Sequence, residues 1–341
     1  MTDKVTLRDI AREVGLSTTS VSLVLNDRPC KISAESRRRI KEAARRKGYI
    51  PNQIARSLVT RRSQTIGLIV PNIESRFFSS LARRLELGCR RRGHLLLITN
   101  SDDSAANDAE LVQTLTNRGV DGLFVVSSTA NEEPGALAEV LGSLPVPFVT
   151  VDRRVEGVSC DRVAFNNEAG GYLACRYLLD AGHERIACLV NVSSSTGRER
   201  LEGYERALRE RGVESDPSLV LPCDYYISDA YEVAGKLLAT DATAVFASSD
   251  NIALGLLKCL YERGLRVPRD YSMVSYDNSA ADVLFEPALT SIEQNVEELA
   301  SAALDVLFRR IEEGERGELG EPEEHILMPR LVIKDSVLAR K

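Results

Sequence analysis

The chain has 341 residues, of which 43% are hydrophobic and 28% are charged, and its formal net charge is −6 at pH 7. This length predicts several domains, and the composition is that of a soluble globular protein. The sequence holds no apolar run near the roughly 20 residues that a membrane span needs and starts without an apolar signal segment, which favours a cytoplasmic protein. The seven cysteines are scattered without CxxC spacing, so we expect reduced thiols, with a redox sensor as the less favoured alternative.

Residues 5–25 predict two short helices joined by a turn at Gly15. Thr6 can cap the first helix, with Asp9 returning a hydrogen bond from the third position, and Ser17 can cap the second. Each helix has one apolar face at helical spacing: Leu7, Ile10, Ala11 and Val14 in the first, Val21, Val24 and Leu25 in the second.

Two helices this short must pack on each other to bury their apolar faces. The second helix then stands out as a rod that fits the major groove of DNA. Its outer side carries Thr19, Ser22 and Leu23, and Thr18 lies at its first turn. An ordinary helical hairpin is the alternative.

The charge distribution favours the DNA-binding interpretation. A third helix is expected after Ser33, with Ile40, Ala43 and Ala44 inside and Gly48 at its end. Residues 1–64 hold 15 Lys/Arg and 6 Asp/Glu, a net charge of +9, so the remaining 277 residues carry −15. Such a contrast is typical of a phosphate-binding module on a regulatory body, whereas a solvated basic face would explain only part of it.

Residues 50–58 have a helical pattern after Pro51 that is too short to be stable in isolation. Apolar Leu58 stands between Ser57 and the polar run 60–64, a placement that a plain flexible linker would not favour.

Beyond residue 64, apolar runs alternate with helical patterns. Strands are predicted over 65–70, 94–99, 122–126 and 146–151, then over 185–190, 243–248 and 272–276. Helices are predicted near 78–92, 107–118, 134–143, 167–181, 198–211, 229–239 and 251–263. This order predicts two open α/β sheets in tandem, with a ligand bound at the carboxyl ends of the strands and between the lobes.

Aromatic, basic, acidic and hydroxyl side chains follow these strands, and the aromatic and charged ones suit a small polyhydroxylated ring. They are Phe77, Phe78, Asp152, Arg153, Ser194, Ser195, Thr196, Arg200, Tyr225, Tyr226, Asp250 and Asp277. Other roles stay open for three of them: Phe77 could belong to the core, Asp277 could cap the next segment, and Asp250 is expected mainly to cap the helix after it.

An enzyme is not indicated. The three histidines, His94, His183 and His325, have no nucleophile at a recognisable spacing. The motifs GxSxG, GxxxxGK[ST], HExxH and GxGxxG are absent. We therefore expect no catalytic residue, metal or cofactor. An exported sugar-binding protein would share the two lobes but would lack the basic head.

The chain resembles the lac repressor family of bacterial transcription regulators (LacI/GalR) over almost its whole length. The head VTLRDIAREVGLSTTSVSLVLND, then KISAESRRRIKEAARRKGYIPNQIARSL and TIGLIVPNI, are similar to the family's opening. GVDGLFV, NNEAGGYLACRYLLDAGHERIA, RLEGYERAL, ASSDNIALGLLKCLYERGLRVPRDYSMVSYDN and PALTSIEQNVEELA follow in the family's order and spacing. The last segment, MPRLVIKDSV, stands where dimeric members stop.

The resemblance implies an all-α helix-turn-helix head over residues 1–48, a hinge helix and linker over 49–63, and an α/β two-lobed body of the periplasmic-binding-protein type I over 64–341. The chain should cross between the lobes three times, giving an N-terminal lobe of about 64–166 and 293–324 and a C-terminal lobe of about 167–292 and 325–341. In the family, hinge helices of a homodimer enter the minor groove of the operator and a leucine wedges into the central step.

These expectations define two sites. The expected DNA contacts are Thr6, Ser17, Thr18, Thr19, Ser22, Leu23, Asn26, Asn52, Ala55 and Leu58. The expected effector contacts are Phe77, Phe78, Asp152, Thr196, Arg200, Tyr225 and Asp277.

Several residues depart from the family's pattern. Leu23 stands where Arg is frequent, so the base preference cannot be borrowed; Ser75-Arg76 replaces Asn-Pro, and Ser275 replaces Gly. Ser194 stands where a purine-binding member has Arg, which disfavours a purine. We expect a repressor controlled by a sugar or sugar derivative; the alternative is a two-lobed small-molecule binding protein without a role in gene regulation.

Overall fold

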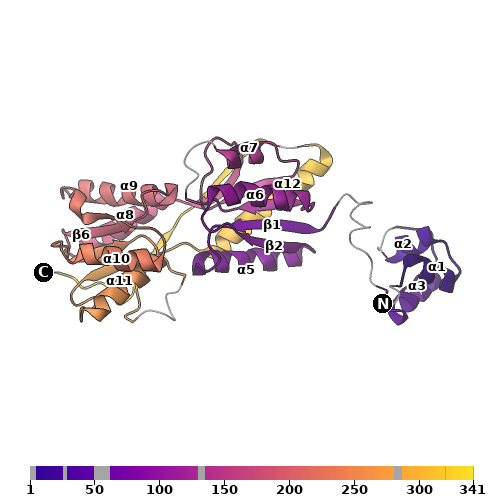
Figure 1. The fold of residues 1–341 in the computed structure, drawn as a ribbon, viewed down its shortest axis with the longest axis horizontal. Helices are drawn as coiled ribbons and strands as arrows, with labels where there is room; N and C mark the ends of the chain where they lie inside the picture. Colours follow the sequence, from indigo (N-terminus) through magenta and orange to yellow (C-terminus); the bar gives the residue numbers. More distant parts are fainter. Residues whose placement is uncertain are drawn as a thin grey trace. The chain divides into compact units, whose positions relative to one another are not determined.

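The fold is that of a computed structural model, which describes residues 5–25, 29–49, 62–129, 135–279, 286–318 and 320–340. The chain divides into two compact units, a head of residues 1–63 and a body of residues 64–341 (Figure 1). The expected contacts Asn26, Asn52, Ala55 and Leu58, and the expected hinge helix, lie outside the described residues.

The head is a three-helix unit whose core is made by one face of each helix. The helices are α1 (Leu7–Val14), α2 (Thr18–Leu25) and α3 (Ala34–Arg46). Ile10, Val21, Val24 and Ile40 are fully buried in the core between them. Gly15 ends α1 with a backbone φ of +68°, a left-handed conformation that glycine adopts without strain.

The body contains two open sheets, each of six strands in the described part of the chain. The first has the order β11-β5-β4-β3-β1-β2, all parallel. Its strands are β1 (Thr65–Val70), β2 (Leu95–Asn100), β3 (Gly122–Val125), β4 (Phe148–Val151), β5 (Asp161–Phe165) and β11 (Glu324–Leu327). Its helices are α5 (Arg76–Arg91), α6 (Ala105–Asn117), α7 (Ala136–Gly142) and α12 (Val296–Arg316).

The second sheet has the order β12-β10-β9-β8-β6-β7, and only the β10–β12 pairing among those described is antiparallel. Its strands are β6 (Ile186–Val190), β7 (Val220–Pro222), β8 (Ala244–Ala247), β9 (Ser272–Asp277), β10 (Thr290–Glu293) and β12 (Arg330–Val332). Its helices are α8 (Asn167–Asp180), α9 (Ser195–Glu210), α10 (Ile227–Leu237) and α11 (Asp250–Glu262), with a short 3₁₀ helix, η1 (Pro217–Leu219).

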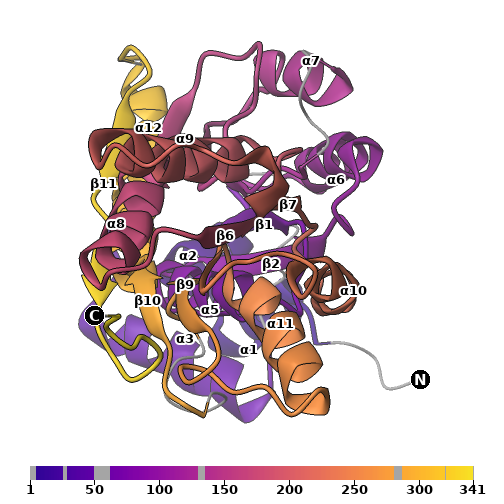
Figure 2. The same cartoon turned by 90° about the vertical axis from the view of Figure 1, so that its left-hand side faces the viewer.

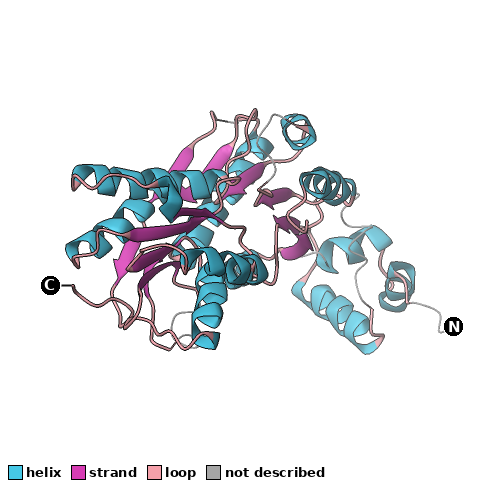
Figure 3. Ribbon diagram, turned by 60° about the vertical axis from the view of Figure 1, so that its left-hand side comes forward, coloured by secondary structure: helices cyan, strands magenta, loops and turns pink. Residues whose placement is uncertain are grey.

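Helices cover both faces of each sheet (Figure 3), so the strands are buried on both sides and need continuous apolar runs. In the first lobe, α5 and α12 pack on one face and α6 and α7 on the other. In the second, α8 and α9 pack on one face and α10 and α11 on the other (Figure 2). The two-lobed α/β fold expected from the sequence is confirmed.

The chain passes between the lobes after β5, after β10 and after β11. We expected the last passage near residue 324, and that boundary is wrong. Residues 324–327 pair with β5 as the outer strand of the first sheet, so the passage follows Leu327. The strand alternates exposed and half-buried side chains rather than forming an apolar run, because it lies at the sheet edge. No described helix is long and apolar enough to span a bilayer.

Candidate DNA-binding face and effector cleft

The outer face of α2 carries the polar side chains predicted to contact DNA. Val21 and Val24 are fully buried against the other two helices, which turns the opposite face of α2 outward. On that face Thr18 and Thr19 are exposed, and Ser22 and Leu23 are half-buried. The structure therefore gathers four of the predicted DNA contacts on one surface.

The other two described candidates, Ser17 and Thr6, act as helix caps. The Ser17 hydroxyl oxygen accepts a hydrogen bond from the Ser20 N–H at 3.1 Å. At α1, the Thr6 N–H and hydroxyl both donate to the Asp9 carboxylate, at 2.9 and 2.6 Å. These bonds satisfy helix-end groups and place both residues at helix N-termini, where backbone N–H groups favour a phosphate.

The basic run of α3 is partly structural. Arg37 donates to the Cys30 carbonyl at 2.9 Å, and Arg39 donates to the Val14 carbonyl at 3.2 Å. Lys47 pairs with Glu13 at 2.9 Å; this pairing, together with Arg46, lowers the pKa of Glu13. Part of the basic face thus stabilises the head, and its positive charges together attract a distant anion through their field.

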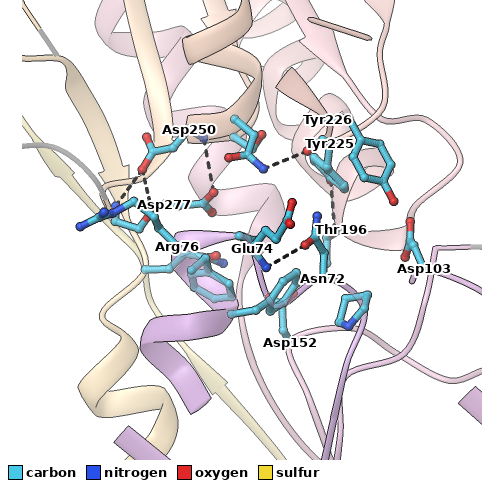
Figure 4. Close-up of a pocket in the computed structure, with 18 of the residues that line it drawn as sticks. Asn72, Glu74, Arg76, Asp103, Asp152, Thr196, Tyr225, Tyr226, Asp250 and Asp277 are labelled. Carbon is cyan, nitrogen blue, oxygen red and sulfur yellow. Dashed lines mark hydrogen bonds between the residues drawn. The ribbon is translucent and has the colours of Figure 1, made fainter. Parts of the chain in front are cut away.

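The two lobes of the body enclose a cavity of about 230 Å³ at the carboxyl ends of their strands. In Figure 4, Tyr225, Thr196 and Asp277 of the C-terminal lobe lie across this space from Asn72 and Glu74 of the N-terminal lobe. All seven predicted effector contacts line the cavity, and Arg153, Tyr226 and Asp250 do so as well. Ser194 and Ser195 do not, although both immediately precede Thr196.

Arg200 is held rigidly in the wall of the cavity. Its Nε donates to the Asn167 Oδ1 at 2.9 Å and its Nη1 to the Ser248 carbonyl at 2.6 Å. The guanidinium also lies over the Tyr276 ring, with its Cζ 3.8 Å from the ring centroid. The side chain is 4% exposed, so a buried cation is fixed in place before any ligand arrives.

Asp152 and Asp277 place two carboxylates beside this cation. Both have positive φ angles, +66° and +84°, which non-glycine residues seldom adopt and which concentrate at functional sites. Burial raises the pKa of Asp152, against the opposing field of Arg200. Burial likewise raises the pKa of Asp277 to about 7, with Arg200 opposing and the nearby Asp250 and Asp152 carboxylates adding to the rise.

The N-terminal lobe contributes aromatic rings. Phe77 and Phe78 meet edge to face, with centroids 5.3 Å apart, and both are almost wholly buried while lining the cavity. Phe77 therefore belongs to the core and also lines the cavity, and its contact with the effector stays a prediction. The Arg153 Cζ lies 5.5 Å from the centroid of the Phe78 ring and 5.8 Å from that of the Tyr225 ring. Arg153 therefore contacts one ring from each lobe.

Ser194 positions Tyr225 rather than lining the cavity. Its hydroxyl lies 3.0 Å from the Tyr225 hydroxyl, and Thr196 lies 3.3 Å from the same oxygen. Ser194 also caps α9 by accepting from the Gly197 N–H at 2.9 Å. Ser194, which stands where a purine-binding member of the family has Arg, therefore caps α9 and holds the Tyr225 hydroxyl in place.

The capping role expected for Asp250 is wrong. Ser249 caps α11, since its hydroxyl accepts from the Ile252 N–H at 3.2 Å. Asp250 instead lines the cavity and accepts hydrogen bonds from the Ser275 hydroxyl at 2.7 Å and the Ser279 N–H at 2.8 Å. The cap of α11 thus stands one residue earlier than expected, because Ser249 has the extended backbone that a cap needs. Asp250 is the first helical residue, and its carboxylate is left to face the cavity.

The sequence prediction missed Gln294 and Asp103. Gln294 follows β10 at a passage between the lobes, is 1% exposed and lines the cavity. Asp103 accepts from Arg153 at 2.9 Å and from the Thr129 hydroxyl at 2.7 Å. A search for polar residues at the crossing segments, and not only at strand ends, would have found Gln294.

Comparisons with known proteins give one consistent family. Residues 6–52 match the family model of bacterial regulatory proteins of the lacI family, and residues 175–337 match that of the periplasmic binding protein-like domain. The HTH-type transcriptional repressor PurR of Pasteurella multocida is 33% identical over 338 residues, covering 98% of this chain and 99% of that protein.

Solved structures agree. A complex of the transcriptional regulator CelR with cellobiose has a TM-score of 0.72 at 30% identity, covering 97% of this chain and 99% of that one. A ribose-bound LacI family regulator from Enterococcus faecium has a TM-score of 0.71 at 33% identity, covering 81% and 100%. The lac repressor dimer bound to operator shares the fold, with a TM-score of 0.85 at 24% identity over 99% and 100% of the two chains.

Proposed function

The chain belongs to the lacI family of bacterial regulatory proteins, which are DNA-binding transcriptional regulators, and we propose that it is a cytoplasmic homodimer that represses transcription from a near-palindromic operator. A small polyhydroxylated effector in the cleft controls it. The observation that carries the proposal is the outward polar face of α2 on a head of net charge +9.

On the DNA, Thr18, Thr19 and Ser22 contact base edges in the major groove, and Leu23 makes an apolar contact, for example to a thymine methyl group. Thr6 and Ser17 approach phosphates at the helix N-termini. Asn26, Asn52, Ala55 and Leu58 are proposed contacts on the family resemblance alone, with Leu58 as the minor-groove wedge.

Dimerisation is supported by the exposed edge of the first sheet. The strand β2 lies at the end of that sheet, and its Leu95 and Ile98 side chains are 62% and 44% exposed. An edge strand with exposed apolar side chains is a surface that proteins usually cover with a partner.

In the cleft, aromatic faces and fixed charged groups favour a sugar. The neighbouring regulators with bound cellobiose and ribose support this choice. We propose that the cleft binds and does not catalyse: none of the three histidines, all within described ranges, lines it, and the Ser194, Thr196 and Tyr225 hydroxyls interact with one another.

Selection from random duplexes with the full-length chain tests the DNA-binding proposal. We expect an enriched near-palindrome contacted in two half-sites about one helical turn apart. The Thr19→Ala protein should enrich a site altered symmetrically in both halves. Failure of the wild-type chain to enrich any palindrome would refute the proposal. Thermal-shift screening of sugars, polyols, nucleobases and organic acids tests the effector class, because a ligand that binds the folded state stabilises it by RT ln(1 + [L]/Kd).

A further inference from the structure

The described residues lining the cavity carry more negative than positive side chains. The carboxylates are Glu74, Asp103, Asp152, Asp250 and Asp277. The guanidiniums are Arg76, Arg153 and Arg200. Glu74 and Arg76 are exposed, where solvent screens them, so the buried groups decide what the cavity accepts.

Two of the other carboxylates are already satisfied by the protein. Arg153 donates to Asp103 at 2.9 Å in a pair that is mostly buried. Asp250 accepts from Ser275 and Ser279, at 2.7 to 2.9 Å. These groups have little need of a ligand.

With Arg153 paired to Asp103, Arg200 is the one other buried cation among the described residues that line the cavity. It lies near both Asp152 and Asp277. The hydrogen bonds that fix Arg200 go to neutral acceptors, Asn167 and the Ser248 carbonyl, and not to either carboxylate. Arg162, which is buried near Asp152, adds a third cation to Arg153 and Arg200. Asp103, Asp152, Asp250 and Asp277 are four carboxylates against these three cations, so the buried groups carry one negative charge more than positive.

Buried polar atoms at the same place lack partners. Asp152 is 4% exposed, and its Oδ1 accepts no hydrogen bond from any described residue. Gln294 is 1% exposed, and neither its amide nitrogen nor its amide oxygen is paired within the described ranges. Unpaired buried groups of this kind are rare and costly, and two of these three atoms are acceptors that need a donor.

The titration of Asp277 agrees with this charge count. Burial raises the pKa of Asp277 to about 7, so at neutral pH the empty cleft is poised to bind a proton. The groups that face Asp277 are Arg200, Asp250, Asp152 and Tyr276, and none of them can supply a second positive charge. A cation delivered by a ligand would fill the same role as that proton.

We infer that the cleft selects its effector by charge: the ligand is a polyhydroxylated molecule bearing a protonated amine that lies against Asp152 and Asp277, with Gln294 pairing to a neighbouring hydroxyl. Ligands that carry a phosphate or carboxylate on the same ring are rejected, because they would bring a second unbalanced negative charge into the cavity. The inference rests on the effector role proposed for the cleft.

The test is calorimetric titration of the full-length protein with matched sugars. Each ring is offered as the neutral sugar, the amino sugar, and the acid or phosphate: glucose, glucosamine, glucuronate and glucose 6-phosphate, and the corresponding galactose and mannose series. We expect the amino form of one ring to bind roughly tenfold more tightly than its neutral form, with no binding of the anions. Affinity for the amino form should be highest near pH 7, because Asp277 must lose its proton while the amine of the ligand keeps its own.

Two variants separate the local effect from total charge. Asp152→Asn keeps the shape of the side chain, and Asn tolerates a positive φ; it should remove most of the preference for the amino form. Glu139→Gln makes the same charge change on the exposed surface of α7 and should leave the preference unaltered.

Tighter binding of a neutral or anionic form than of its amine would overturn the inference, and so would a panel in which nothing binds. Equal effects of the two variants would also overturn it, since the preference would then follow net charge. None of these outcomes bears on operator selection, so a failure here is distinguishable from a failure of the DNA-binding proposal.

Discussion

The head and the body keep their proposed functional side chains in opposite surroundings. On α2, the predicted DNA contacts Thr18 and Thr19 are exposed and make no part of the head's core. In the cleft, Arg200 and Asp152 are buried, and Arg200 is hydrogen-bonded to Asn167 inside its lobe. We therefore expect recognition and stability to be separable in the head and to depend on the same residues in the body.

The largest effect is expected for Arg200→Ala. Removing this guanidinium takes away the buried cation that acts most strongly on both Asp152 and Asp277. The loss should destabilise the body by about 3–5 kcal/mol and abolish the response to effector. Urea unfolding of the body and ligand titration measure the two effects. Arg310→Ala is the matched control: Arg310 forms a buried pair with Asp161, both bonds being 2.8 Å, and does not line the cavity.

Arg310→Ala should therefore destabilise the body to a similar degree and leave ligand affinity intact. If it abolished ligand binding as fully as Arg200→Ala does, the site assignment of Arg200 would have no support.

Asp277→Asn should change how body stability depends on pH. The pKa of Asp277 is about 7 in the folded protein against 3.8 for an ordinary aspartate, so between these values the folded state holds a proton that the unfolded state releases. Stability of the wild-type body should fall as pH rises through this window, by up to about 4 kcal/mol. Melting of Asp277→Asn from pH 4 to 8 should show a flatter profile; an unchanged slope would contradict the raised pKa.

Leu58→Ala should act on specific binding more than on general affinity. The wedge works only on a deformable central step, whereas the basic head attracts any phosphate backbone. We expect a loss of roughly 1–3 kcal/mol on the operator and little change on a scrambled duplex at the same salt concentration. Equal losses on both duplexes would place Leu58 in the core of the head.

Ser17→Ala should cost the head about 1 kcal/mol through the lost α2 cap, without affecting the body. Because the cap precedes the recognition face, the variant should weaken operator and scrambled binding together. Ser33→Ala, which removes the cap of α3, provides the comparison: it should cost a similar amount of stability while leaving α2 intact. A larger DNA-binding loss for Ser33→Ala than for Ser17→Ala would contradict the role of α2.

The sequence predicted the fold where one physical signal dominated. Apolar runs such as 65–70 must be parallel strands covered on both faces, and β1 has those bounds. The strand β5 escaped prediction because its charged Asp161 and Arg162 hide the apolar pattern; both are buried, and Asp161 pairs with Arg310. The 21-residue helix α12 was not among the predicted helices, although its buried residues Leu299, Ala303 and Leu307 recur at helical spacing.

The cleft was predicted from residues at strand ends, and the structure brings those residues together. The sequence could not show which acid is satisfied and which is not. Asp250 and Asp277 each follow a strand, yet hydroxyl donors from Ser275 and Ser279 reach only Asp250. That distinction depends on the approach of β8 and β9 in space, and Gln294 likewise enters the cavity only because the chain passes between the lobes there.

The most direct test of the comparison is the ratio of operator to scrambled-duplex affinity for the full-length protein, measured for the wild type and for Thr19→Ala with Ser22→Ala at one salt concentration. We predict that the double variant binds the operator at least roughly tenfold more weakly, on the scale of one or two mismatched base pairs, and keeps its affinity for the scrambled duplex. Its free energy of unfolding should lie within about 0.5 kcal/mol of that of the wild type. An equal loss on both duplexes, or a destabilised head, would contradict this prediction, because the exposed face of α2 would then hold the head together instead of recognising DNA.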